Sequence, residues 1–117
     1  MILIPPGVRI LLAAQPVDFR KGMDGLAALV QQALRADPFQ GDVFIFRARR
    51  ADRVKLLVYD GTGLVLCSKR LEAGRFCWPS PTDGVVRLSA AQLATLLEGL
   101  VWHHLQPRPV RRPSTAW

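Results

Sequence analysis

Residues 42–59 read DVFIFRARRADRVKLLVY, and this stretch decides the fold of the chain. Two runs rich in β-branched and aromatic residues, 42–47 and 53–59, flank a short connection that contains two arginines. Such an arrangement predicts a β-hairpin. Strand alternation places Val54, Leu56 and Val58 on one face of the second strand, and the other face carries Arg53, Lys55, Leu57 and Tyr59. If the face with Val54 packs in the core, Lys55 points outward beside the arginines of the turn.

The residues on either side of the hairpin predict further strands. The sequence Asp60-Gly61-Thr62-Gly63 predicts a tight reversal into a third strand at 64–71, because glycine readily adopts the positive φ angles of such turns. An apolar run at 8–14 predicts a strand before the hairpin. Residues 85–88 predict a short edge strand after it.

A first helix is expected between the early strand and the hairpin. In residues 22–34 the apolar side chains recur at intervals of three and four, so they share one face of a helix. Asp18 precedes this stretch and is a candidate cap for its first turn. Residues 37–38, an Asp-Pro pair, are expected to end the helix.

A second helix is expected at residues 90–103, where Ser89 and Gln92 have the spacing of a capping box. The order of elements is then β-α-β-β-β-(β)-α, an α+β fold with a mostly antiparallel sheet. Residues 1–105 have the length of a single domain. Residues 106–117 are rich in Pro and Arg without apolar periodicity, which predicts a flexible basic tail.

The chain is strongly basic. Its 16 Lys and Arg residues against 9 Asp and Glu residues give a formal net charge of +7. Most of these cations are arginines, whose planar guanidinium suits phosphates and base edges. Such a surplus favours polyanions, of which nucleic acid is the commonest in a cell. A solvated basic surface without a partner is the alternative interpretation.

We expect Arg47, Arg49, Arg50 and Arg53 to cluster around the tip of the hairpin. DNA is expected to bind this surface, because a two-stranded ribbon fits the major groove of a duplex. Phe76 is expected in the core, whereas Trp78 is open to either core packing or base stacking. A hairpin whose charges only protect the sheet from edge pairing is the alternative. The candidate DNA-binding residues are Arg20, Lys21, Arg47, Arg49, Arg50, Arg53, Lys55, Lys69, Arg70, Arg75, Trp78, Arg108, Arg111 and Arg112.

No catalytic residue is assigned, because metal-dependent hydrolysis needs two or three converging carboxylates and the acids here lie mostly in turns. No metal or cofactor is expected, since Cys67 and Cys77 have no second pair and no histidine at zinc-finger spacing. A small metal-dependent nuclease that uses Asp60 and Glu72 with a histidine is the least favoured alternative.

A series of motifs resembles one known family. The motifs are DFRKGMDGL at 18–26, PFQG at 38–41, FIFRARR at 44–50, DRVK at 52–55, DGTG at 60–63, KRLE at 69–72, GRF at 74–76, WP at 78–79 and LLEG at 96–99. Together they resemble the TnpB-type accessory protein, encoded by the second reading frame of the insertion sequence 66 family of bacterial mobile elements. The resemblance implies a role accessory to a separate transposase, to which catalysis would belong.

Our leading hypothesis is a non-catalytic accessory protein that binds DNA through the basic hairpin and tail and assists assembly of the transposase complex. The alternative is an adaptor that binds an acidic patch on the transposase without contacting DNA. A homo-oligomer, formed through the strand near Val8 or the second helix, stays open. We expect a cytoplasmic protein, associated with the nucleoid if it binds DNA, since no apolar run approaches the about 20 residues of a membrane span.

Overall fold

The computed structural model describes residues 7–80 and 84–102, and it confirms the α+β prediction. The predicted tail at 106–117 lies outside the described residues. In chain order the elements are β1 (Ile10–Ala13), α1 (Met23–Gln32), β2 (Val43–Arg47), β3 (Arg53–Tyr59), β4 (Leu64–Arg70), β5 (Val85–Leu88) and α2 (Ala90–Leu97).

The five strands form one sheet in the order β4-β3-β2-β1-β5. β1 pairs with β2 in parallel, because α1 carries the chain back between them, and every other pairing is antiparallel. The predicted hairpin is β2–β3, and the predicted edge strand β5 pairs with β1. The prediction of a mostly antiparallel sheet is therefore confirmed.

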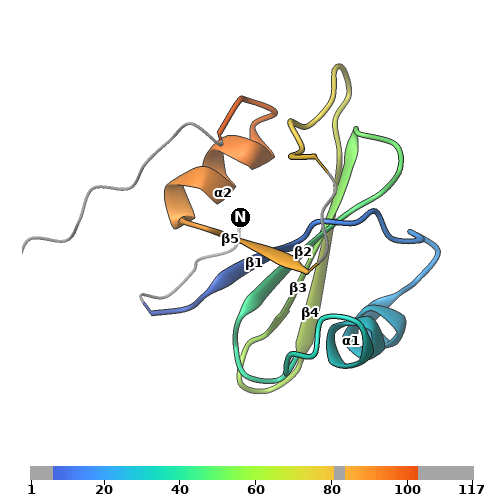
Figure 1. Ribbon diagram of the computed structural model, residues 1–117, viewed down its shortest axis with the longest axis vertical. Helices are drawn as coiled ribbons and strands as arrows, with labels where there is room; N and C mark the ends of the chain where they lie inside the picture. The colour runs from blue at the N-terminus through green and yellow to red at the C-terminus, as the bar shows by residue number, and fades with distance from the viewer. Residues whose placement is uncertain (1–6, 81–83, 103–117) are drawn as a thin grey trace, which may run out of the picture.

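The two helices cover opposite faces of the sheet (Figure 1). Ile10 and Leu12 of β1 belong to the core that includes Leu93 and Leu96 of α2, whereas Leu11 belongs to the core under α1. A strand that is covered on both faces needs apolar side chains at successive positions. This explains why β1 and most of β2 are continuous apolar runs instead of alternating ones.

α1 is shorter than predicted and is not capped by Asp18. It begins at Met23 with Gly22 as its N-cap residue, and no side chain donates or accepts a capping hydrogen bond there. The carboxylate of Asp18 instead accepts hydrogen bonds from Arg20. The helix ends at Gln32, before the Asp-Pro pair at 37–38, and Arg35 follows in the left-handed region with φ of 51°.

α2 begins as predicted and ends earlier. Ser89 accepts a hydrogen bond from the backbone of Gln92, whose side chain accepts one from the backbone of Ser89. The helix stops at Leu97, because Gly99 adopts a φ of 76° and reverses the chain. The chain then returns Trp102 to the core, where its indole nitrogen donates to the backbone oxygen of Cys77 at 2.6 Å.

Replacing Ser89 with alanine tests the capping box. We expect the free energy of unfolding to fall by about 1 kcal/mol, because one backbone donor at the start of α2 loses its partner. Denaturant titration followed by circular dichroism measures this change. The matched control is Ser68→Ala on β4, an exposed serine whose side chain forms no hydrogen bond in the described part of the chain. Equal destabilisation of the two variants would contradict the assignment.

Candidate nucleic-acid interface

The turn between β2 and β3 is held in place from behind by the segment that follows β4. The backbone oxygen of Ala51 accepts hydrogen bonds from the backbone nitrogen of Phe76 at 2.8 Å and from the indole nitrogen of Trp78 at 3.2 Å. The backbone oxygen of Asp52 accepts one from Leu71 at 2.9 Å. Phe76 is buried in the core as predicted, and Trp78 is half-buried and supports the turn.

Arg47 does not share a surface with the other arginines of the hairpin. Its position in β2 is opposite Val54, whose side chain is in the core that α2 covers. Its guanidinium donates to the backbone oxygen of Pro79 at 3.1 Å and lies 5.3 Å from the ring centroid of Trp78. Burial lowers the pKa of Arg47. The expected clustering of Arg47 with Arg49 is therefore corrected, because strand alternation turns Arg47 to the opposite face.

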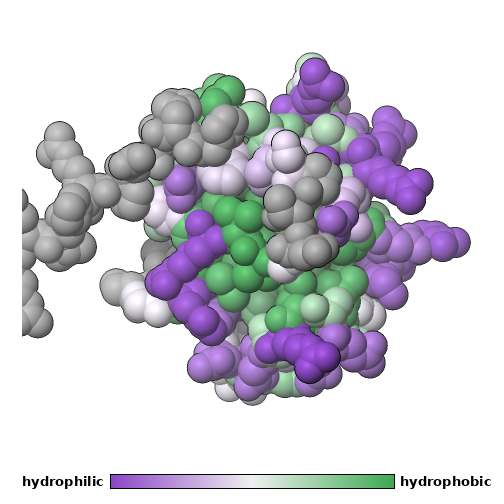
Figure 2. Space-filling view, in the orientation of Figure 1, coloured by the Kyte–Doolittle hydropathy of each residue, from purple (hydrophilic) through white to green (hydrophobic). Residues whose placement is uncertain are grey.

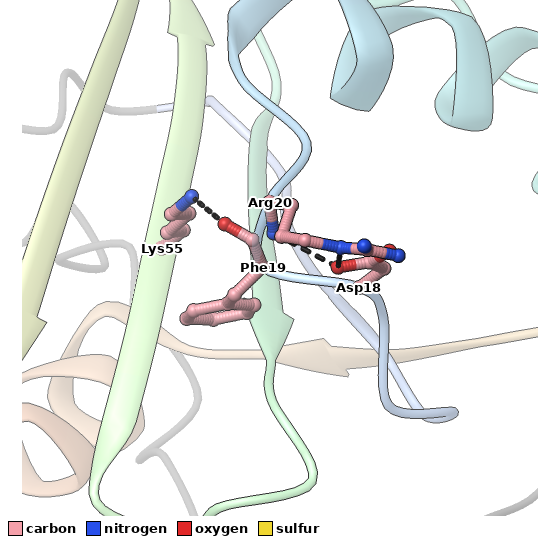
Figure 3. A network of polar contacts seen from close by, with 4 residues as sticks. All are labelled: Asp18, Phe19, Arg20 and Lys55. Carbon is pink, nitrogen blue, oxygen red and sulfur yellow. Dashed lines mark hydrogen bonds and ion pairs between the residues drawn. The ribbon is translucent and has the colours of Figure 1, made fainter.

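Lys55 lies on the predicted face of β3, but its ammonium group is not free. The Nζ atom donates to the backbone oxygens of Phe19 at 2.8 Å and Lys21 at 3.0 Å. It also lies 4.9 Å from the centroid of the Phe19 ring (Figure 3). Lys55 thus fixes the segment between β1 and α1 instead of pointing outward with the turn arginines, as the sequence suggested.

A groove of about 490 Å³ opens between that segment and the β2–β3 turn. The backbone nitrogen of Val17 donates to the backbone oxygen of Arg47 at 2.8 Å, so the segment after β1 crosses the end of β2. Hydrophilic side chains gather at the corresponding edge of the molecule, on the right of Figure 2. We call this site the arginine groove; its lining residues are Pro16, Val17, Asp18, Phe19, Arg20, Ala48, Arg49, Arg50 and Arg53.

The arginine groove unites Arg20 with three arginines of the hairpin. Sequence reasoning proposed all four as DNA-binding residues, but it did not place them in one concave site. It also missed the apolar wall that Pro16, Val17, Phe19 and Ala48 contribute. No local pattern signals this wall, because its residues belong to two segments that meet only in the folded chain.

Two carboxylates partly balance the charge of the groove. Arg20 donates to the carboxylate of Asp18 from Nη2 at 2.7 Å and from Nε at 3.0 Å. The Oδ1 atom of Asp52 lies 3.8 Å from the Nε atoms of both Arg50 and Arg53, a distance longer than a hydrogen bond. Arg49 forms no ion pair within the described part of the chain. The groove therefore keeps a positive balance.

The remaining candidates are dispersed. Lys69 donates to the backbone oxygen of Leu97 at 2.8 Å and caps the end of α2. Arg70 is exposed and pairs directly with Arg53 across β3 and β4, on the same face of the sheet. Lys21 and Arg75 are exposed outside the groove lining. Arg108, Arg111 and Arg112 lie outside the described residues.

The acids of the nuclease alternative do not meet. Asp60 lies in the β3–β4 turn, where its Oδ1 atom accepts hydrogen bonds from the backbone of Thr62 and Gly63, which lower its pKa. Glu72 follows the other end of β4, a strand about 20 Å long at the usual rise per residue. Within residues 7–80 and 84–102, no three His, Cys, Asp or Glu side chains are placed to hold a metal ion.

The Asp18–Arg20 pair is measurable by titration. Side-chain and backbone hydrogen bonds from Arg20 lower the pKa of Asp18 from 3.8 to about 2. The stability that this pair contributes is complete above the unfolded pKa and is lost as the pH falls toward 2. Carboxyl carbon shifts measured by NMR should show the pKa of Asp18 rising toward 3.8 in Arg20→Gln and unchanged in the control Arg35→Gln. An unchanged value in both variants would contradict the pairing.

Comparison with known proteins places the chain in a family. Residues 8–107 match the family described as "IS66 Orf2 like protein". Two relatives from Sinorhizobium fredii (strain NGR234) are similar over nearly their whole length. "Uncharacterized protein y4jC" is 48% identical over 108 residues, covering 92% of each chain. "Uncharacterized protein y4hO" is 40% identical over 114 residues, covering 96% of this chain and 97% of the relative.

No solved structure matches the chain. Neither α1 nor α2 has the length and apolar character that a membrane-spanning helix needs. The family match extends over both helices and all five strands, so it includes every element that builds the arginine groove. The chain belongs to the IS66 Orf2 like family and is thus an accessory protein associated with transposition.

Proposed function

We propose that this accessory protein binds DNA through the arginine groove and thereby helps a transposase complex to assemble, without performing catalysis itself. One observation carries the proposal: four arginines from two distant segments line a single groove. Guanidinium groups bind phosphate oxygens through two parallel hydrogen bonds. A concentration of them on one side of a basic protein is the electrostatic footprint of a nucleic-acid site.

The pairing of Arg53, which lines the groove, with Arg70, which lies outside the lining, supports a functional role for the charge at this edge of the molecule. The two residues lie directly opposite each other on β3 and β4. Like charges in directly opposite positions destabilise a sheet. A bound polyanion offsets this cost, because its phosphates neutralise both side chains. Within the chain, Asp52 lies 3.8 Å from Arg53 and offsets only part of this cost.

A second candidate function follows from the carboxylates that already contact the groove. Arg20 and Arg50 lie beside the carboxylates of Asp18 and Asp52, so these guanidinium groups already interact with carboxylates. The same surface could bind an acidic patch on the transposase, which would hold DNA only indirectly. Capture of the transposase after nuclease treatment distinguishes the two functions, because a protein contact survives the removal of DNA.

Removing the turn arginines tests the proposed function. We expect Arg49→Gln/Arg50→Gln to weaken binding of DNA and to reduce its salt dependence, by about 0.9 in log–log slope for each phosphate that the variant no longer binds. Gel shifts at two salt concentrations measure both effects. The control Arg35→Gln/Arg87→Gln removes the same charge at exposed positions outside the groove. Equal weakening in both double variants would show that the net charge of the protein, and not the groove, accounts for the binding of DNA.

Removing the competing carboxylate should have the opposite effect. We expect Asp18→Asn to bind DNA several-fold more tightly, because Arg20 loses an anionic partner while asparagine still offers an acceptor to its backbone nitrogen. Asp24→Asn is the control, since it makes the same change in charge at an exposed site on α1. Fluorescence anisotropy titrations compare the variants. Weaker binding by Asp18→Asn would exclude Arg20 as a phosphate contact.

A further inference from the structure

We propose that the arginine groove takes an unpaired nucleotide of single-stranded DNA, with its phosphate on the arginines and its base against the apolar wall. This inference rests on the proposed function, because it assigns a strand state to the same site. The lining of the groove combines cationic and apolar side chains, and a site that binds phosphates alone does not need the apolar ones.

The lining has two parts that match the two parts of a nucleotide. Arg20, Arg49, Arg50 and Arg53 offer cations, and the wall of Pro16, Val17, Phe19 and Ala48 offers apolar contact. Proteins that bind single strands combine these same features, a basic groove for the backbone and aromatic side chains for the bases. The volume of about 490 Å³ lies within the range of pockets that hold small organic ligands.

The surroundings of the turn do not favour insertion into a duplex. A ribbon that reads the major groove must protrude, so that its tip reaches the base edges. Here the turn is tied on one side through Ala51 to Phe76 and Trp78. On the other side Val17 binds the backbone of Arg47, and residues 16–20 lie against the turn. The site is thus a concavity, which admits a single strand more readily than a double helix.

The arginines keep donors available for a phosphate. Arg49 forms no ion pair or side-chain hydrogen bond in the described residues, and its side chain is exposed. The Nε atoms of Arg50 and Arg53 lie 3.8 Å from the Oδ1 atom of Asp52, which is too far for a hydrogen bond. Phe19 is fixed beside them, because Lys55 binds its backbone oxygen and lies over its ring (Figure 3). The half-buried Phe19 ring also packs against the core under α1, so a base would contact the part of the ring that the core and Lys55 leave exposed.

The test compares two DNA probes on the full chain. Anisotropy titrations use a short oligothymidylate and a duplex of equal length at the same salt concentration. We expect the single strand to bind more tightly. Phe19→Leu should weaken its binding by about tenfold, within the range of one base stacking contact, and leave duplex binding unchanged. Phe39→Leu is the matched control, because Phe39 is an exposed phenylalanine that packs against Tyr59, away from the groove lining.

Photo-crosslinking gives a second measurement on the unmodified protein, in case Phe19→Leu does not fold. A strand that contains 5-bromodeoxyuridine should crosslink to the peptides carrying residues 16–20 or 48–53. Crosslinks confined to other peptides would overturn the assignment. Tighter binding of oligouridylate than of oligothymidylate would also overturn it, because the proposed ligand is DNA and not RNA. Equal affinity for single strand and duplex with no effect of Phe19→Leu would overturn the inference while DNA binding stands. Failure to bind either probe would remove the proposed function as well.

Discussion

The register between β2 and β3 controls where the charge of this protein lies. With Arg47 opposite Val54 and Lys55 opposite Phe46, alternate cations of one hairpin point to opposite faces of the sheet. Arg47 then stacks on Trp78 and supports the turn, while Lys55 reaches the segment between β1 and α1. A shift of one residue would exchange these roles, because every side chain of the shifted strand would change face.

Lys55 holds the site in shape through its contacts with backbone oxygens, and the arginines that line the groove supply its charge. Lys55 anchors the backbone of residues 19 and 21, which brings Arg20 to the edge of the hairpin. Lys69 donates to the backbone oxygen of Leu97 at the end of α2 and does not line the groove. Some basic residues of this small protein thus bind backbone oxygens, others line one groove, and Lys21 and Arg75 are exposed elsewhere. Net charge alone does not reveal that division.

The acids near the groove reduce its positive charge. Asp18 and Asp52 lie close enough to weaken the attraction of a polyanion without cancelling it. Asp60 lies in the turn before β4 and Glu72 follows its far end, so the two carboxylates do not share a site.

The sequence by itself determined the elements, the capping box of α2 and the family motifs. The bounds of β3 and β5 follow from residues that are neighbours in the chain, so hydrophobic periodicity and turn-forming residues were sufficient to predict them. The end of α2 was set by the left-handed Gly99, and the missing cap of α1 by the pairing of Asp18 with Arg20. Only the tertiary structure decided which arginines share a groove. That choice depends on strand register and on hydrogen bonds between residues more than thirty positions apart, such as Lys55 with Phe19, and local patterns carry no record of such contacts.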